Sequence, residues 1–356
     1  MCDNFQVRRN ALRRLLEKRC LDAILISYDA NRYYLSGFEL HDTQYNESSG
    51  YLIIGADGKE YIVTDSRFEE AAHRLFLPDS VIIYHQNSID VVHSLLKKCG
   101  IRIGVEMKTL PFHFLKRLID YSDLAIEPCD DLLERMRSIK DPNEVQALEK
   151  SFALNHTLLL WLEHELKPGL SEQDISWAIE KFFRENGASE LAFPSIVAVG
   201  ENAAMPHAIP GSRLLEENNL VLIDVGCRVD GYCSDQTRTF WVGEKQSDRF
   251  VETVRLVREA QEAAISSMHP GMAFRDVYKK AHAVFEKAGV SEFFTHGLGH
   301  GVGLETHERP SLSDKALGIL EPGMVVTVEP GLYYKEWGGV RWEFTVLVEE
   351  TGVRVL

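Results

Sequence analysis

The chain of 356 residues is 45% hydrophobic and 26% charged, which is typical of a globular protein with room for two domains. Its 54 acidic and 39 basic residues leave a formal net charge of −15, which argues against nucleic acid or a membrane surface as a partner, because both attract a basic surface. No run approaches the roughly 20 apolar residues of a membrane span, and the charged start of the chain lacks an apolar signal core. We therefore expect a cytoplasmic protein whose six cysteines are reduced.

The first part of the chain alternates helical and strand patterns. Apolar residues have helical spacing in residues 10–19 and again near residues 91–98. Short apolar runs predict strands at residues 23–26, 51–54, 61–64, 81–84 and 101–105. This alternation predicts an α/β domain over residues 1–135.

A domain boundary is predicted next to Arg135, so that residues 136–356 form the second domain. Shortly after it, Asp141 is a plausible cap and Pro142 stands just inside the start of a long helix, at residues 144–166.

Two further helices are predicted in the second domain. Ser171, followed by Asp174, forms a variant of the capping box at the start of residues 171–186. Apolar residues from Phe250 to Met268 mark an amphipathic helix.

Asp224 and Asp235 lie in apolar segments on either side of Asp230-Gly231, a strong signal for a β-hairpin. If these two residues form the turn, Asp224 lies opposite Thr237. Side chains alternate between the faces of a sheet, so the two carboxylates become diagonal neighbours on one face, roughly 7–8 Å apart at the backbone. Two unpaired anions so close would repel each other, and we expect a metal ion between them.

Two more carboxylates interrupt apolar strands near the end of the chain. Glu329 ends one such run, and Glu343 lies between Trp342 and Phe344. A reversal of the chain centred on Glu336 would place the two glutamates directly opposite each other. Isolated carboxylates inside apolar strands are unfavourable unless they are paired or bind a metal.

A glycine-rich segment, residues 295–303, adds two histidines. His296 and His300 have the four-residue spacing of a zinc-protease helix, but the alternating glycines disfavour a helix. An extended strand is predicted instead, with both histidines on one face. Four carboxylates and one imidazole suit two divalent ions of the Mn, Co, Fe or Zn type.

The segment from about residue 136 to the end resembles the pita-bread metallopeptidase family, which includes methionine aminopeptidase, aminopeptidase P and prolidase. Five motifs carry the resemblance: LIDVG with Asp224, YCSDQTRT with Asp235, HGLGHGVG with His300, TVEPG with Glu329, and GVRWEFTVLV with Glu343. The resemblance implies that these five residues bind two divalent metal ions, manganese first, with cobalt or zinc as alternatives. Asp235 and Glu343 would bridge the two ions.

The resemblance also implies roles for residues around the metal ions. His207, His307 and Glu329 would be catalytic, with Glu329 carrying a proton to the leaving group. His296 and Arg341 would bind the substrate.

Residues 1–135 resemble the creatinase-type domain of aminopeptidase P and prolidase, on the motifs LDAIL, YLSGF, TDSR and IGVE. Methionine aminopeptidases lack this domain. The implied fold class is α+β, with a C-terminal pita-bread domain preceded by a smaller α/β creatinase-type domain. The chain departs from the family at Trp342 and Phe344, where the family usually has an aliphatic and an acidic residue.

The resemblance thus implies an exopeptidase that hydrolyses the Xaa-Pro bond at the amino end of peptides or in Xaa-Pro dipeptides. Its substrates would be small peptides with proline in the second position, and the family resemblance implies a homodimer. Dipeptidase and longer-peptide activity both stay open. So do a metal-independent creatinase-like amidinohydrolase and a non-catalytic binding protein, although the complete ligand set argues against both.

Overall fold

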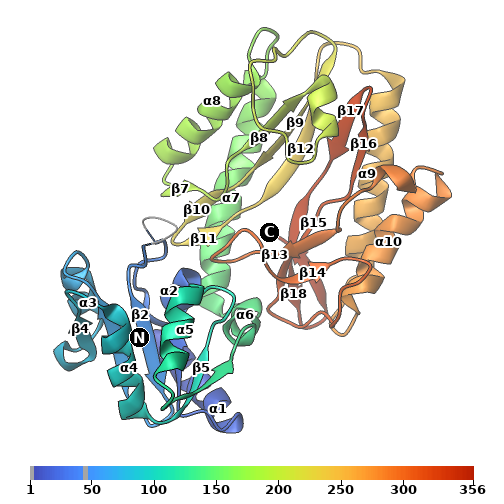
Figure 1. Cartoon of the computed structure of the whole chain (residues 1–356). Helices are drawn as coiled ribbons and strands as arrows, with labels where there is room; N and C mark the ends of the chain where they lie inside the picture. The colour runs from blue at the N-terminus through green and yellow to red at the C-terminus, as the bar shows by residue number, and fades with distance from the viewer. Residues whose placement is uncertain (1–3, 43–46) are drawn as a thin grey trace. The chain divides into compact units, whose positions relative to one another are not determined.

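A computed structural model describes residues 4–42 and 47–356. Contacts divide the chain into two units, Met1–Met136 and Arg137–Leu356 (Figure 1). In the described part of the chain, every helix is too short or too polar to span a bilayer.

The first unit is built on a six-stranded mixed sheet, in the order β4-β3-β2-β1-β5-β6. Its strands are β1 (Ala23–Ile26), β2 (Tyr51–Gly55), β3 (Glu60–Thr64), β4 (Val81–Ile83), β5 (Arg102–Val105) and β6 (Ala125–Pro128). Its helices are α1 (Asn4–Lys18), α2 (Asp29–Ser36), α3 (Glu69–Leu75), α4 (Ser88–Cys99) and α5 (Phe112–Asp120), with the short η1 (Pro78–Ser80) before β4, and α6 (Leu132–Ser138) runs across the division into the second unit. All five predicted strands and both predicted helices are confirmed, while the sequence patterns missed β6 and the helices α2, α3, α5 and α6.

The second unit holds most of the sheet structure of the chain. Its helices are α7 (Pro142–Glu165), α8 (Glu172–Glu185), α9 (Asp248–Ser267) and α10 (Phe274–Lys287), with the short helices η2 (Gly200–Ala204) and η3 (Ser291–Phe293). Its strands are β7 (Glu190–Leu191), β8 (Ile196–Val199), β9 (Asn219–Val225), β10 (Cys227–Val229), β11 (Tyr232–Cys233), β12 (Gln236–Val242), β13 (Gly299–Gly301), β14 (Glu308–Leu312), β15 (Val325–Val328), β16 (Gly331–Tyr334), β17 (Gly338–Arg341), β18 (Phe344–Glu349) and β19 (Gly352–Val355). Within this unit, α7 and α8 lie on one side of the strands and α9 and α10 on the other (Figure 1).

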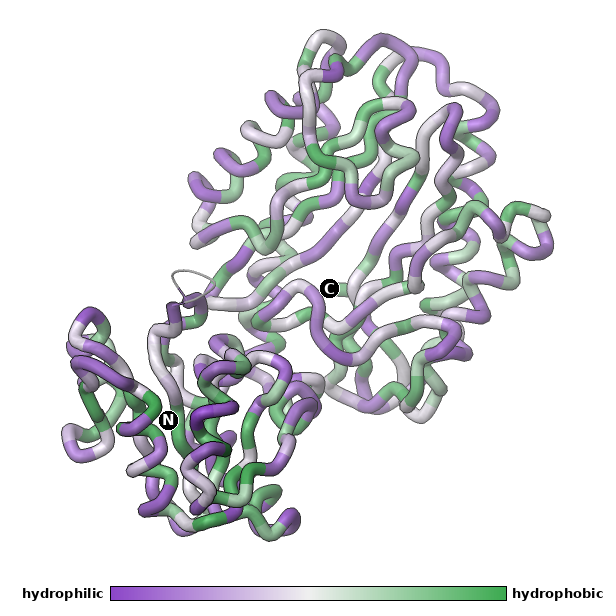
Figure 2. Tube along the Cα trace, in the orientation of Figure 1, coloured by the Kyte–Doolittle hydropathy of each residue, from purple (hydrophilic) through white to green (hydrophobic). Residues whose placement is uncertain are grey.

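The three helices predicted in the second unit are confirmed as α7, α8 and α9, while the sequence patterns missed α10. Asp141 caps α7 in a full capping box, and Ser171 does the same for α8. Their apolar residues pack in two clusters, one beneath α7 and α8 and the other beneath α9 and α10. Hydrophilic and hydrophobic residues accordingly alternate along these helices (Figure 2).

Both predicted hairpins have the predicted register. In the first, Val229 pairs with Tyr232 and Thr237 pairs with Asp224. In the second, every residue pair is symmetric about Glu336, both in β16–β17 and farther from the turn in β15–β18.

Each hairpin is interrupted by a short break in its ladder. The first breaks at Gly226, between β9 and β10, and at residues 234–235, between β11 and β12. A Cβ atom at Gly226 would overlap the carbonyl oxygen of Ser234, so only glycine fits this close approach. The second breaks at residues 329–330 and 342–343. Three of the four predicted metal-binding carboxylates lie in these breaks.

Candidate active site

A cavity of about 540 Å³ in the second unit collects most of the predicted site residues. The predicted residues that line it are His207, Asp224, Asp235, His296, His300, His307, Glu329 and Arg341. Glu343 is buried behind them, with a carboxylate oxygen within 4.8 Å of oxygens from both Asp224 and Asp235. The structure therefore brings all nine predicted residues to one place.

The three carboxylates Asp224, Asp235 and Glu343 form an anionic cluster in the core. Burial raises the pKa of Asp235 and of Glu343 well above the ordinary value, and the neighbouring carboxylates raise both further. Among the described residues, Asp224 Oδ1 and Glu343 Oε1 have no hydrogen-bond donor. Buried oxygens of this kind are unfavourable unless a cation or a donor satisfies them.

His300 faces two of the carboxylates from β13. Its Nε2 lies 3.5 Å from Asp235 Oδ2 and 3.4 Å from Glu329 Oε1. Its Nδ1 lies 3.1 Å from its neighbour's carbonyl oxygen, at Gly301. A carbonyl only accepts, so Nδ1 carries a proton and Nε2 is the ring atom that faces the carboxylates, the arrangement of a metal-binding histidine.

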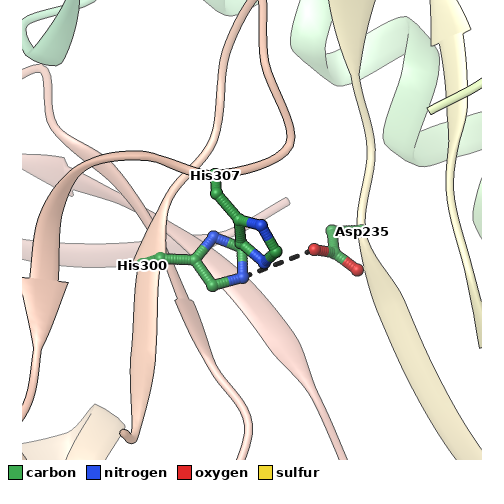
Figure 3. A group of neighbouring side chains, drawn as sticks. All are labelled: Asp235, His300 and His307. Carbon is green, nitrogen blue, oxygen red and sulfur yellow. Dashed lines mark ion pairs between the residues drawn. The ribbon is translucent and has the colours of Figure 1, made fainter. Parts of the chain in front are cut away.

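The rings of His307 and His300 pack edge to face, with 4.1 Å between ring centroids (Figure 3). One nitrogen of each ring and one oxygen of Asp235 lie within 4.8 Å of one another. Burial lowers the pKa of His307, which favours the neutral ring. His307 was predicted as a catalytic residue, and its position is also close enough to contact an ion.

Arg341 connects the carboxylates to residues outside the cluster. Its Nη2 donates to Asp224 Oδ2 at 2.6 Å, and its Nε donates to Thr237 Oγ1 at 2.9 Å. Thr237 Oγ1 in turn donates to Glu343 Oε2 at 2.9 Å. Arg341 thus supplies a fixed positive charge and orients two carboxylates, besides its predicted contact with substrate.

Tyr333 links Arg341 to His296 and was missed from the sequence. Arg341 Nη1 donates to the Tyr333 hydroxyl, and that hydroxyl lies 2.8 Å from His296 Nε2. His296 Nδ1 lies 2.7 Å from the carbonyl oxygen of Gly297, so Nδ1 carries the proton and Nε2 accepts from Tyr333. Burial lowers the pKa of His296, in keeping with a neutral ring. The only signal for Tyr333 in the sequence is its place four residues after Glu329.

The predicted long strand through both histidines is wrong in extent. Only Gly299–Gly301 form a strand, and His296 lies in the segment before it. At the start of this strand, Gly299 pairs with Leu312, the last residue of β14. Both histidines nevertheless line the cavity.

A buried glutamate that the sequence analysis overlooked holds the loop with His207. Glu172, in the first turn of α8, is fully buried. Its Oε1 accepts from the backbone N–H of Val199 and from Asn202 Nδ2, and its Oε2 accepts from the N–H of Gly211, each at 2.8 Å. The two ends of the loop are therefore tied to one carboxylate.

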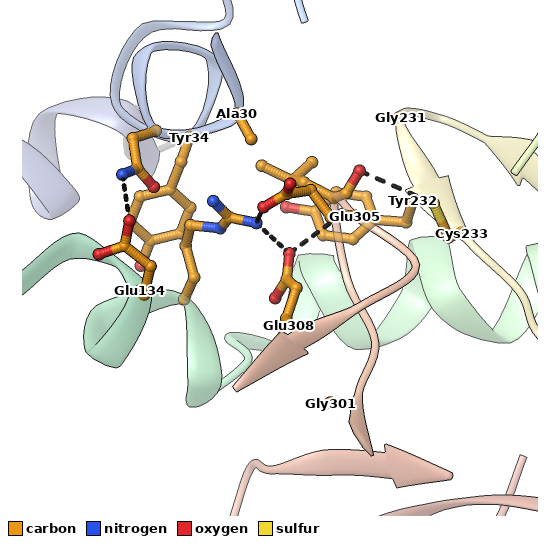
Figure 4. Close-up of polar contacts among 12 residues, drawn as sticks. Ala30, Tyr34, Glu134, Gly231, Tyr232, Cys233, Gly301, Glu305 and Glu308 are labelled. Atoms are coloured by element: carbon orange, nitrogen blue, oxygen red, sulfur yellow. Dashed lines mark hydrogen bonds and ion pairs between the residues drawn. The ribbon is translucent and has the colours of Figure 1, made fainter. Parts of the chain in front are cut away.

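The loop with His307 is anchored by a second buried network. Glu308 accepts hydrogen bonds from Arg137 and, at 3.1 Å, from Lys140, while Arg137 also pairs with Glu305 at 2.6 Å. Glu305 and Glu308 lie close together in this network (Figure 4). Burial alone would raise the pKa of Glu308, but the two basic groups hold it at about 2. No local pattern in the sequence joins these residues, because about 170 positions separate them.

Comparisons with known proteins cover both units. Residues 146–350 match the model of metallopeptidase family M24, and residues 8–139 match that of the creatinase/prolidase N-terminal domain. The peptidase YqhT of Bacillus subtilis is 34% identical over 348 residues, which cover 97% of this chain and 96% of that protein. A Xaa-Pro dipeptidase of Pyrococcus horikoshii is 32% identical over 343 residues, which cover 96% and 94%.

Solved structures agree with these matches. The Xaa-Pro dipeptidase from Bacillus anthracis superposes with a TM-score of 0.92 at 31% identity, covering 99% of this chain and 97% of that one. The prolidase from Pyrococcus furiosus superposes with a TM-score of 0.86 at 29% identity, covering 96% and 98%.

Proposed function

The chain belongs to metallopeptidase family M24, and we propose that it is an exopeptidase that hydrolyses Xaa-Pro bonds. The observation that supports this most directly is the meeting of five distant side chains, from Asp224 to Glu343, around one cavity and its buried wall. Relatives described as Xaa-Pro dipeptidases match nearly the whole chain, so neither a creatinase-like amidinohydrolase nor a non-catalytic binding protein is favoured. In this proposal, residues 1–135 are the creatinase-type domain and residues 136–356 are the catalytic domain.

The donor set fits two divalent metal ions, for which manganese is our first choice and cobalt or zinc the alternatives. The ligands would be Asp224, Asp235, His300, Glu329 and Glu343. The carboxylate oxygens without donors on Asp224 and Glu343 support this fit, because a cation would satisfy both. Ions of this kind, when bound, polarise a carbonyl group and lower the pKa of water.

The remaining chemistry falls to side chains that line the cavity. In our proposal, Glu329 takes up a proton and returns it to the proline nitrogen as that nitrogen leaves. His207 and His307 donate hydrogen bonds to the substrate carbonyl oxygen as negative charge develops on it. His296, held by Tyr333, shapes the wall of the cavity beside Arg341.

The size of the cavity, about 540 Å³, suits a small peptide. We propose substrates with proline in the second position, either dipeptides or longer peptides, and a homodimer in the cytoplasm as the working form.

The test uses protein stripped of metal by a chelator and then reloaded with manganese, cobalt or zinc. Hydrolysis is measured on Xaa-Pro dipeptides, on Xaa-Pro-Xaa tripeptides and on matched Xaa-Ala peptides. We expect cleavage of the proline peptides alone, lost on stripping and restored by at least one metal, and absent from Asp224→Asn with every metal. Cleavage that persists after full removal of metal, or equal cleavage of Xaa-Pro and Xaa-Ala peptides, would refute the proposal.

A further inference from the structure

The break in the second hairpin keeps one backbone hydrogen bond across it, from the N–H of Trp342 to Pro330 O at 3.3 Å, and Pro330 has no N–H to donate in return. Strands β15 and β18 pair up to Val328 and Phe344, and β16 and β17 pair again from Gly331 and Arg341. Glu329 and Glu343 lie between these paired stretches, on opposite arms of the hairpin. Buried carbonyl groups in such a break must find donors elsewhere.

One side chain donates a hydrogen bond to a backbone carbonyl group on each arm of the hairpin, next to the break. Gln261, on α9, is 3% exposed, and its Nε2 donates to Val328 O at 2.8 Å and to Trp342 O at 2.9 Å. These two acceptors immediately precede Glu329 and Glu343. A single buried amide group therefore joins the two arms of the hairpin at the residue before each glutamate, and it uses both of its N–H groups to do so.

A second side chain holds the break from behind Glu343. Arg238 Nη1 donates to Thr237 O at 2.8 Å and to the carbonyl oxygen of Glu343 itself. Its guanidinium carbon lies 4.8 Å from the ring centroid of Trp342 and 4.5 Å from that of Phe344. Because Trp342 and Phe344 flank Glu343 and side chains alternate, both rings lie on the face opposite the carboxylate. The two residues that depart from the family pattern thus fix the orientation of the arginine.

The first hairpin has a comparable arrangement. Asn155, on α7, is fully buried and donates through Nδ2 to Val225 O at 2.9 Å. Val225 follows Asp224 and is the last residue before the break at Gly226. Buried amides from two different helices therefore bind carbonyl groups next to site carboxylates at both breaks.

We infer that Gln261 and Arg238 are positioning residues, which hold the interrupted strands at the separation that lets Glu329 and Glu343 bind the same metal centre. The inference rests on the proposed metal site. A carboxylate pair must be held within about 0.5 Å of its metal-binding geometry to bind metal tightly. Here the ladder that would normally fix the pair is reduced to one backbone hydrogen bond, from Trp342 N–H to Pro330 O at 3.3 Å. In this arrangement the side chains of α9 and β12 reinforce the weakened ladder.

A purely structural role for these residues predicts a different result from a positioning role. If Gln261 only stabilised the fold, its loss would resemble the loss of another buried hydrogen bond on α9. Thr253 supplies that control, because it is 3% exposed and its hydroxyl bonds to Arg249 O at 2.7 Å and to the side chain of Tyr334, but not to either carbonyl group beside the break.

The experiment titrates cobalt(II) into stripped full-length wild type, Gln261→Met and Thr253→Val, and follows the visible absorption of bound cobalt. We expect the cobalt Kd of Gln261→Met to rise about 10- to 100-fold, with an altered absorption spectrum, because residues that orient ligands contribute this much to affinity. Thr253→Val should bind cobalt as wild type does, even where its thermal stability falls. Wild-type affinity and spectrum in Gln261→Met would overturn the inference.

Two further variants keep the test decisive should Gln261→Met fail to fold. Gln261→Asn keeps the amide on a shorter side chain that cannot reach both carbonyls, and it should lose cobalt affinity while folding. Arg238→Lys keeps a charged donor but loses the stacked guanidinium, and it should weaken cobalt binding less than Arg238→Met does. Equal cobalt binding in all these variants would overturn the inference. The titration needs no peptide, so wild type that binds cobalt without cleaving Xaa-Pro peptides would refute the proposed function alone.

Discussion

The loop that carries His207 depends on one buried carboxylate, and its loss should reduce both stability and activity. Replacing Glu172 with glutamine keeps the shape of the side chain and one acceptor oxygen. That oxygen can retain the two hydrogen bonds now made by Oε1, while the new NH₂ group faces the N–H of Gly211. Loss of a hydrogen bond to a charged group removes about 1.5–3 kcal/mol, and opposed buried donors add about 1 kcal/mol more. We therefore expect Glu172→Gln to lower the free energy of unfolding by about 2.5–4 kcal/mol.

Urea unfolding followed by tryptophan fluorescence measures this loss, because all five tryptophans lie in the unit Arg137–Leu356. A matched control is Glu185→Gln on the same helix, which is exposed and should change stability by no more than about 0.5 kcal/mol. The value of kcat on a Xaa-Pro peptide should fall by about 10-fold or more in Glu172→Gln, since the histidine of the loop loses its fixed position. Equal stability of Glu172→Gln and wild type would show that the three bonds do not hold this loop.

Three further outcomes are expected. Stripping the metal should lower the thermal midpoint, and reloading at 100 times the Kd should restore about 2.7 kcal/mol, measured by calorimetry; a midpoint indifferent to metal would contradict the site. Tyr333→Phe removes the hydroxyl between Arg341 and His296, so kcat should fall about 10-fold or more at unchanged metal content, and an unchanged kcat would deny the link a catalytic role. The basic partners of Glu308, of which Lys140 has the largest effect, hold the pKa of this carboxylate at about 2, below the ordinary 4.5. The contribution of Glu308 to stability is therefore complete above pH 4.5 and is lost as the pH falls toward 2. Between pH 5 and 2, urea unfolding should show wild type losing about 3 kcal/mol more than Glu308→Gln, and parallel curves would contradict the pairing.

Features governed by short-range rules could be predicted from the sequence. The turn at Asp230-Gly231 and the two-residue period of strands determine that Asp224 faces Thr237, and the structure has this pair. The register about Glu336 followed from the same period. The meeting of these hairpins with His300 could not be deduced from spacing, and it came from the resemblance of five motifs to one family.

Contacts between distant segments account for what was missed. Gln261 belongs to a helix whose pattern predicts only which face is buried, and nothing local marks its bonds to Val328 and Trp342. Glu172 reads as an ordinary acidic residue at a helix start, where the dipole favours it anyway. Its loop partners, such as Gly211, become neighbours only in the folded chain.

The shared register of β15–β18 and β16–β17 has a consequence for the length of an exposed turn. Residues 335–337 join β16 to β17, and the pairing on both sides of the break is counted from them. Deleting or inserting one residue there would slip one strand against the other, and a slip of one exchanges its faces. The indole of Trp342 would then point where the carboxylate of Glu343 now lies. Indels in this surface turn should therefore be as damaging to the site as substitution of a ligand.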